Sequence, residues 1–196
     1  MSHPARPPET RPTERLGRRL ASGTAIYQAG DNGLAWRLQR GVVRLDSVGR
    51  DGEWQFASLA IAGDILGCET LLLGSYAFSA SALTDCSLSP WPEGAPALAG
   101  ESLLASLATA QRRAADVVAL RGGQAAERVL GLIRLLADAG GRVVLPSRQD
   151  IADITDLRFE TISRIISNLQ RENLLTPLRV AGVHATRSFQ MHCPPA

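Results

Sequence analysis

Lysine is absent from the 196-residue sequence, and all 21 basic residues are arginine. The planar guanidinium group suits bidentate contacts with phosphate and guanine, but a net charge of only +2 does not by itself indicate a nucleic-acid partner. No apolar run approaches the roughly 18 residues needed to cross a bilayer, and the polar, proline-rich start does not resemble a signal peptide. We therefore expect a cytoplasmic globular protein, with no membrane partner, of one large or two small domains.

Cysteine and histidine are both scarce. The cysteines are Cys68, Cys86 and Cys193, and the histidines are His3, His184 and His192. An odd number of cysteines without C-x-x-C spacing excludes a disulfide framework or a cysteine-built zinc site within one chain. A cupin-type barrel enzyme is a remote alternative. Its metal needs two or three barrel histidines and a carboxylate, and no histidine lies between residues 20 and 91. Without a nucleophile–base pair or a phosphate loop, we predict no catalytic residues, no metal site and no enzymatic activity.

The first half of the chain divides into a polar arm and a glycine-punctuated region. Residues 1–19 hold five arginines, four prolines and few apolar side chains, which predicts a flexible arm. Residues 20–95 contain short apolar segments at 23–27, 35–38, 42–45, 55–59 and 78–83. Several short strands spaced by about 8–12 residues are typical of an antiparallel sandwich or barrel. Gly49-Arg-Asp-Gly52 predicts a hairpin turn within it.

The hydrophobic period becomes helical from residue 96 onward. A heptad seam is formed by Leu103, Leu107, Ala110, Ala114 and Val117, on a segment that ends at Gly122-Gly123. Such a helix either lies on the barrel of its own chain or packs against a twin helix, and we favour a dimerisation helix over residues 96–123. A second helix is predicted over 124–139, with Gly140-Gly141 as its stop.

Residues 145–175 predict a helix-turn-helix. Ser147 and Asp150 form a variant capping box for a short first helix, and residues 155–157 form a tight link. A second helix then runs from about 158 to 172. Its predicted buried face consists of Phe159, Ile162, Ile165, Ile166 and Leu169. Arg158 stands where a Ser or Thr cap is usual, so this helix either starts elsewhere or is capped by Asp156.

The opposite face of this second helix carries a polar stripe. The stripe consists of Glu160, Ser163, Arg164, Ser167 and Arg171, three and four residues apart. In a major groove, glutamate accepts from cytosine N4 and arginine bonds guanine O6 and N7, whereas on a solvated face Glu160 and Arg164 would form an ordinary i,i+4 salt bridge. The helix-turn-helix context favours base contact. Residues 174–184 then predict a two-stranded wing turning at Gly182, with Arg179 or Arg187 near a phosphate.

The order of these parts resembles the Crp/Fnr family of bacterial transcription regulators over residues 20–190. In the barrel region the resemblance includes Gly41-Val-Val-Arg-Leu45 and Gly63-Asp-Ile-Leu-Gly67. Ala125-Ala-Glu-Arg-Val-Leu130 resembles the start of the family's DNA-binding domain. The most specific motif is Glu160-Thr-Ile-Ser-Arg164, which is similar to the Glu-x-x-Ser-Arg signature of the Fnr branch.

The resemblance implies an α+β fold: a β-roll or jelly-roll sensor domain at 20–95, a dimerisation helix at 96–123 and a winged helix-turn-helix at 124–196. It further implies a homodimer that reads inverted TTGAT-type half-sites on double-stranded DNA and acts with RNA polymerase as an activator. The implied base-reading residues are Glu160, Ser163 and Arg164. The implied backbone contacts are Arg148, Gln149 and Thr161.

The chain departs from the family's known effector sites. Residues 76–80 offer no cation for a nucleotide phosphate, so cyclic AMP is not expected. No cysteine precedes Cys68, so an iron–sulfur cluster is not expected either. The barrel has no histidine to hold haem, which leaves Cys68 as the candidate haem ligand. A redox- or haem-responsive regulator using Cys68 or Cys86 therefore stays open, although a lone cysteine with apolar neighbours is more often a small buried hydrophobe.

Overall fold

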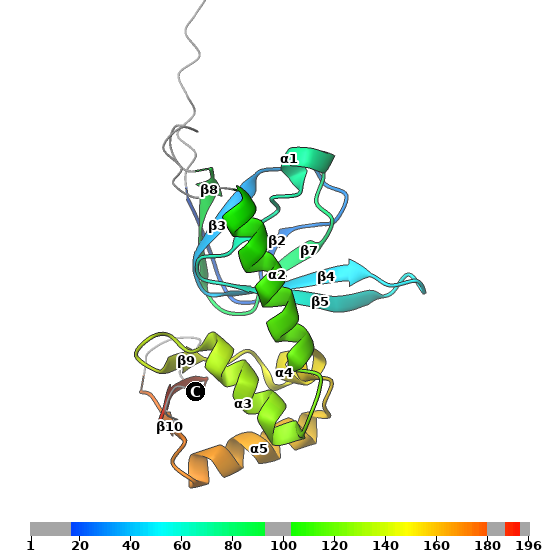
Figure 1. Cartoon of the computed structure of the whole chain (residues 1–196). Coiled ribbons are helices and arrows are strands. Elements are labelled where there is room, and N and C mark those ends of the chain that lie inside the picture. Colours follow the sequence, from blue (N-terminus) through cyan, green and yellow to red (C-terminus); the bar gives the residue numbers. More distant parts are fainter. Residues whose placement is uncertain (1–16, 93–102, 180–186, 193–196) are drawn as a thin grey trace, which may run out of the picture.

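The computed structural model describes residues 17–92, 103–179 and 187–192. Strands dominate the first range and helices the second, so the chain forms an N-terminal β-roll and a C-terminal helical unit (Figure 1). This is the predicted α+β fold class. Among the described residues, no helix is both long and apolar enough to span a membrane.

The β-roll consists of two four-stranded sheets in which all paired strands are antiparallel. The first sheet has the order β1 (Arg18–Leu20), β8 (Cys86–Trp91), β3 (Ala35–Arg40) and β6 (Ile65–Leu66). The second has the order β2 (Ala25–Tyr27), β7 (Ser79–Ala82), β4 (Val42–Val48) and β5 (Trp54–Ile61). A short helix, α1 (Thr70–Leu73), connects β6 to β7. Five of these strands, β2, β3, β4, β5 and β7, lie in the glycine-separated segments that predicted them, whereas β1, β6 and β8 were not predicted.

Two details of the β-roll concern its edges. The first strand begins at Arg18, so the arm predicted for residues 1–19 ends earlier than expected. The hairpin between β4 and β5 is confirmed, because Gly49 N–H donates to the Glu53 carbonyl at 2.8 Å and Val48 pairs with Trp54. Gly52 has a φ of +82°, which glycine adopts without the steric cost of a side chain.

The helical unit is linked to the β-roll by a long helix, α2 (Leu103–Ala119), which runs from one to the other (Figure 1). After it come α3 (Ala125–Leu136), β9 (Arg142–Val144), α4 (Arg148–Thr155), α5 (Phe159–Arg171), β10 (Leu175–Pro177) and β11 (Ser188–Met191). The three strands form an antiparallel sheet in the order β10-β11-β9.

Two sequence-based boundaries in this unit were wrong. The helix predicted to continue to residue 139 ends at Leu136, because Ala137 has extended backbone and Gly140 and Gly141 belong to the following turn. The Asp138 carboxylate organises this turn by accepting from the N–H groups of Gly140 and Arg142, each at 2.9 Å. The second wing strand was expected by residue 184 but lies at 188–191, and the predicted turn at Gly182 is outside the described residues.

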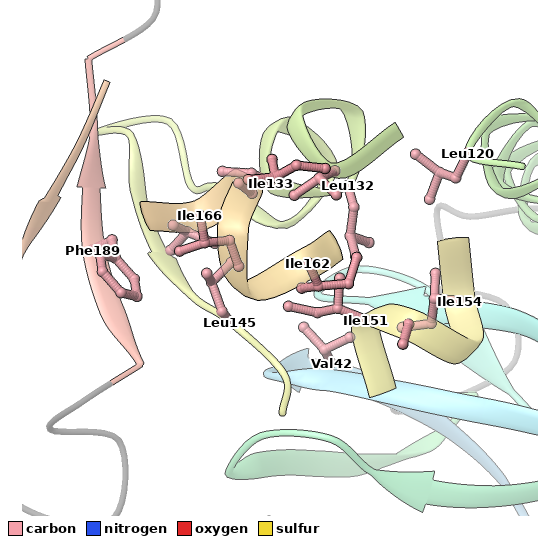
Figure 2. Close-up of a cluster of buried hydrophobic side chains, with 14 of the residues drawn as sticks. Val42, Leu120, Leu132, Ile133, Leu145, Ile151, Ile154, Ile162, Ile166 and Phe189 are labelled. Atoms are coloured by element: carbon pink, nitrogen blue, oxygen red, sulfur yellow. The ribbon is translucent and has the colours of Figure 1, made fainter. Parts of the chain in front are cut away.

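The hydrophobic core has two clusters. One fills the β-roll, with Leu38 and Val43 fully buried at its centre. The other fills the helical unit but also includes Val42, Leu59 and Leu83 of the β-roll. Figure 2 shows Val42 among Ile151, Ile154 and Ile162 of the helical unit. The two units are therefore joined by shared apolar packing as well as by α2.

Gly41, between β3 and β4, tests the close packing of this turn against Asp85 and Cys86 within the β-roll. Its φ is +99°, and a methyl group there would lie 2.5 Å from the Asp85 carbonyl oxygen and 2.6 Å from Cys86 Sγ. Gly52 also has positive φ, but a methyl group there meets nothing within 4 Å. We expect Gly52→Ala to cost about 1–2 kcal/mol from backbone strain alone. Gly41→Ala should cost about 1–3 kcal/mol more, measured by urea unfolding. Equal losses of unfolding free energy in the two variants would contradict the close contact of Gly41 with Asp85 and Cys86.

Candidate nucleic-acid interface

Two local features fix the two ends of α4. Ser147 Oγ accepts from the Asp150 N–H at 3.1 Å, and the Asp150 carboxylate accepts from the Ser147 N–H at 3.2 Å, so the predicted capping box starts α4. Asp156 then ends α4 in the left-handed region, with φ +53°, and its N–H donates to the Ala152 carbonyl. Aspartate tolerates this conformation better than most residues, so the chain turns without glycine.

The start of α5 differs from both sequence-based possibilities for its cap. The helix begins directly after Arg158, whose extended backbone makes it the N-cap without any side-chain capping bond. Asp156 does not cap α5, because it closes the preceding helix. The first turn of α5 therefore leaves its N–H groups without a capping side chain.

The inward face of α5 packs against the rest of the helical unit. Ile162 and Ile166 are fully buried, and Ile165 and Leu169 nearly so. Phe159, predicted to be buried with them, is instead 48% exposed. Helical side chains lean toward the N-terminus, so the ring of the first residue extends beyond the helix end, where no preceding turn covers it. An aromatic side chain thus lies beside the polar stripe.

The outward face of α5 carries the polar stripe into solvent. Glu160 and Arg164 are exposed, and Ser163 is half-buried. Within the described part of the chain, neither Glu160 nor Arg164 makes an ion pair or a side-chain hydrogen bond. The i,i+4 salt bridge is therefore not formed, and both charged groups are available to an outside partner. Farther along, Ser167 Oγ donates to the Ser163 carbonyl at 2.9 Å, and Arg171 contacts Asn168.

The expected backbone-contacting residues lie in the first turns of the two helices. Arg148 is half-buried at the start of α4, and burial lowers the pKa of its guanidinium group without removing the charge. Gln149 is exposed, and its side-chain amide donates to Asp153 Oδ1 at 2.9 Å. Thr161 is half-buried in the first turn of α5. Helix N-termini attract phosphate through their free N–H groups, so this location suits the expected role.

The two arginines proposed for the wing lie in different places. Arg179 is exposed, just after β10. The Arg187 guanidinium is directed back to the β-roll, where Nη2 donates to Ser22 Oγ at 3.4 Å. The sequence predicted that either Arg179 or Arg187 lies near a phosphate, and the contact of Arg187 with Ser22 favours Arg179.

The α2 helix does not present the whole predicted seam to solvent. Leu107, Ala110 and Ala114 are exposed, but Val117 is buried in the core of its own chain. The side chain of Leu103 lies outside what the structure describes. Because α2 packs on its own chain through Val117 and Leu120, the outward apolar stripe is rotated and includes Val118, which is 72% exposed. We call Leu107, Ala114 and Val118 the outward stripe.

Two tyrosine rings stack in the hydrophobic core of the β-roll. Tyr27 and Tyr76 stack with centroids 3.7 Å apart, and the Tyr76 hydroxyl donates to the Leu34 carbonyl at 2.7 Å. The Tyr76 ring occupies space that Gly33 and Gly67 leave open, since a methyl group at either would lie within 2.5 Å of Tyr76 atoms. Tyr76 is therefore fixed by close packing against Tyr27, Gly33 and Gly67.

A small cavity of about 240 Å³ lies between α2 and the strands β5 and β6. Arg113 is the only cation among the described residues that line it, and Arg113 Nε donates to the Asp64 carboxylate at 3.2 Å. Its volume is below the roughly 300 Å³ at which ligand pockets usually begin. The cavity therefore provides neither the size nor the free positive charge that a nucleotide phosphate requires.

The described thiols lie in environments that oppose ionisation. Cys86 is buried, its Sγ donates to the Thr84 carbonyl at 3.2 Å, and burial raises its pKa to about 11. Burial and, secondarily, the Glu69 carboxylate raise the pKa of Cys68 as well. Cys193 lies outside the described residues. Among the residues described, no three His, Cys, Asp or Glu side chains gather where they could hold a metal ion.

Two family models match the chain. The cyclic nucleotide-binding domain matches residues 17–95, and the Crp-like helix-turn-helix domain matches residues 127–184. The chain belongs to the Crp/Fnr family of transcription regulators. It is therefore a DNA-binding transcription regulator, as the helix-turn-helix predicted. Among the described residues, those that line the cavity between α2 and this Crp/Fnr β-roll nevertheless do not fit a cyclic nucleotide, because their one cation, Arg113, is paired with Asp64.

Relatives in the Crp/Fnr family include two nitrogen fixation regulation proteins FixK. That of Rhizobium meliloti is 34% identical over 160 residues, covering 78% of this chain and 74% of the relative. That of Bradyrhizobium diazoefficiens is 33% identical over 206 residues, covering 90% and 86%. The solved structure of FixK2 from Bradyrhizobium japonicum aligns with a TM-score of 0.66 and 28% identity, over 91% of this chain and 92% of that one. A CRP-family transcriptional regulator from Thermus thermophilus aligns with the same TM-score of 0.66 and 26% identity, covering 89% and 91%.

The raised thiol pKa values predict low cysteine reactivity. A thiol with a pKa of about 11 is less ionised than an ordinary cysteine at every pH below that value, and only about one in a thousand is thiolate at pH 8. In a Cys193→Ala background, we expect Ellman's reagent at pH 8 to modify Cys68 slowly and Cys86 only after unfolding in urea. Single Cys68→Ala and Cys86→Ala variants assign the two phases. Modification of folded Cys86 at the rate of free cysteine would contradict the burial.

Proposed function

We propose that this regulator is a homodimer that reads inverted half-sites on duplex DNA through the outward face of α5. The observation that carries the proposal is the division of this helix into two faces. Ile162 and Ile166 are fully buried, while Glu160 and Arg164 are exposed and without partners in the described chain. Because these two charged side chains project from a packed helix and have no partner in the described chain, they are available to contact an external surface.

Each group on this face suits a particular contact. Glu160 accepts from cytosine N4, Arg164 donates to guanine O6 and N7, and the Phe159 ring suits a thymine methyl group. Ser163 adds a hydroxyl that can either donate or accept a hydrogen bond. This combination supports the TTGAT-type half-site implied by the family signature, which holds both T·A and G·C pairs. Arg148, Gln149 and Thr161 are proposed to hold the DNA backbone.

The outward stripe of α2 is proposed as the dimer contact. Leu107 is 47% exposed and Val118 is 72% exposed, although both are large apolar side chains. A twin helix would remove them from water, at about 25 cal/mol per Å² of apolar surface buried. Two α5 helices related by the resulting twofold axis then require half-sites about one helical turn apart.

We propose that the dimer binds DNA without a cyclic nucleotide, because the cavity between α2 and the β-roll is small and its one described cation, Arg113, is paired with Asp64. Under this proposal the β-roll supports the DNA-binding unit and contacts RNA polymerase when the regulator activates transcription. The thiol-based alternative gains no support from the structure, since the environments of Cys68 and Cys86 raise both pKa values.

Selection of bound duplexes from a random pool tests the proposed half-site, and Arg164→Ala tests the assignment within it. We expect this variant to lose about 1–3 kcal/mol of discrimination between guanine and other bases at one position of each half-site. Binding to random DNA should change little, because the exposed guanidinium is one cation among several. Fluorescence anisotropy on matched and substituted duplexes measures both quantities.

Arg171→Ala is the matched control, since it removes the same charge from the last turn of α5. Phe159→Ala should weaken the preference for thymine in the selected half-site. An equal loss of affinity for specific and random DNA in Arg164→Ala would show that Arg164 contacts phosphate instead of a base.

The dimer contact is tested by placing a charge in the outward stripe. Val118→Asp should convert the wild-type particle, of twice the 20.9 kDa chain mass, into a monomer in light scattering after gel filtration. Ala119→Asp is the control, because it adds the same charge in the same helical turn but about 100° around the helix. A Val118→Asp variant that stays dimeric would place the interface elsewhere.

A further inference from the structure

An arginine of the β-roll contacts the DNA-binding unit directly. Arg44 lies in β4, and its Nε donates to Asp46 Oδ1 at 2.7 Å. Its Nη1 donates to Asp153 Oδ2 in α4 at 3.0 Å and lies 3.8 Å from Asp150 Oδ1. The Arg44 side chain is only 17% exposed. Three carboxylates from two units thus surround one half-buried guanidinium group.

A second arginine reaches the same helix from the end of α2. Arg121 Nη2 donates to the Asp153 carbonyl at 2.9 Å, and its Nε donates to the Ile154 carbonyl at 3.1 Å. The guanidinium groups of Arg44 and Arg121 lie 5.6 Å and 5.2 Å from the centre of the Phe56 ring in β5. We call Arg44, Phe56 and Arg121 the arginine clamp. Arg44 attaches α4 to the β-roll, Arg121 attaches it to the end of α2, and Phe56 lies beside both guanidinium groups.

The arginine clamp is coupled to a proposed DNA contact through one carboxylate. Asp153 Oδ2 accepts from Arg44, while Asp153 Oδ1 accepts from the Gln149 amide at 2.9 Å. Asp150, the other α4 carboxylate near Arg44, is the partner of the N-cap Ser147 in the capping box that starts this helix. The β-roll therefore fixes both the position of α4 and the orientation of a side chain at its N-terminal turn.

From this geometry we propose that the arginine clamp sets the spacing between half-sites that the dimer accepts. The inference rests on the proposed function. If α2 joins the two protomers, the distance between their α5 helices depends on how rigidly each DNA-binding unit is held on its own β-roll. Shared apolar packing around Val42 and Ile151 resists separation, but apolar contacts are non-directional. The directional bonds of Arg44 and Arg121 fix the orientation, so Arg44 and Phe56 are positioning residues.

The test uses a series of palindromes whose central spacer is lengthened or shortened by one or two base pairs. We expect the wild-type dimer to bind one spacing at least about tenfold more tightly than its neighbours, because rigid docking tolerates little change in half-site separation. Arg44→Gln and Asp153→Asn should reduce this preference to about threefold or less. Affinity for a duplex with a single half-site should stay within about twofold, since α5 itself is unchanged.

Three comparisons separate the clamp from a general loss of structure. Arg50→Gln removes an exposed charge from the β4–β5 hairpin and should keep the wild-type spacing preference. Phe56→Leu retains apolar bulk while removing both ring contacts, and should broaden the preference as Arg44→Gln does. The Arg44→Gln/Asp153→Asn double variant should match the single variants, because both remove the same bond. Thermal unfolding by circular dichroism confirms that each variant is folded, and Phe56→Leu and Asp153→Asn carry the test if Arg44→Gln does not fold.

Sharp spacing preference in folded Arg44→Gln, Asp153→Asn and Phe56→Leu would overturn the clamp and leave the proposed function intact. Failure of the wild-type protein to prefer any palindrome over random DNA would overturn the proposed function itself. A broadened preference in these variants but not in Arg50→Gln would establish the clamp.

Discussion

The structure depends on the burial of one face of α5. Ile162 and Ile166 are fully buried in a cluster that also contains Ile151 and Ile154 of α4. Val42 of the β-roll belongs to the same cluster. Each such side chain contributes about 1.5–3 kcal/mol when it leaves water. Because the apolar face of α5 is committed inward, its charged face can only point outward. The direction of the polar stripe is thus a consequence of packing, and the β-roll takes part in that packing.

Features with local causes could be predicted from the sequence. The glycine-separated strands, the Ser147–Asp150 capping box and the two faces of the second helix all follow from short-range periodicity and turn chemistry. The same periodicity misplaced Phe159, because a helical wheel treats the first residue as if a preceding turn covered it. It also misassigned Val117, since a heptad pattern does not show which neighbour, its own chain or a twin, covers a given position.

Features with long-range causes gave no readable signal. Arg44 and Asp153 are 109 residues apart, and nothing near either residue marks them as partners. Arg187 was assigned to the wing by its position after Gly182, whereas its side chain contacts Ser22, 165 residues away. The absence of a cation in residues 76–80 can be read from the sequence, and it argues against a nucleotide phosphate there. The close packing of Tyr76 against Gly33 and Gly67 is a long-range contact that the sequence does not show.

The seating of Tyr76 between two glycines has a further consequence for the chemistry of the β-roll. Neither Gly33 nor Gly67 can gain a side chain while the tyrosine remains, so the three positions are sterically interdependent. Replacing Tyr76 alone by a smaller residue would leave a space bordered by the Tyr27 ring and by the backbone of Gly33 and Gly67. A flat synthetic aromatic compound matches the shape of that space.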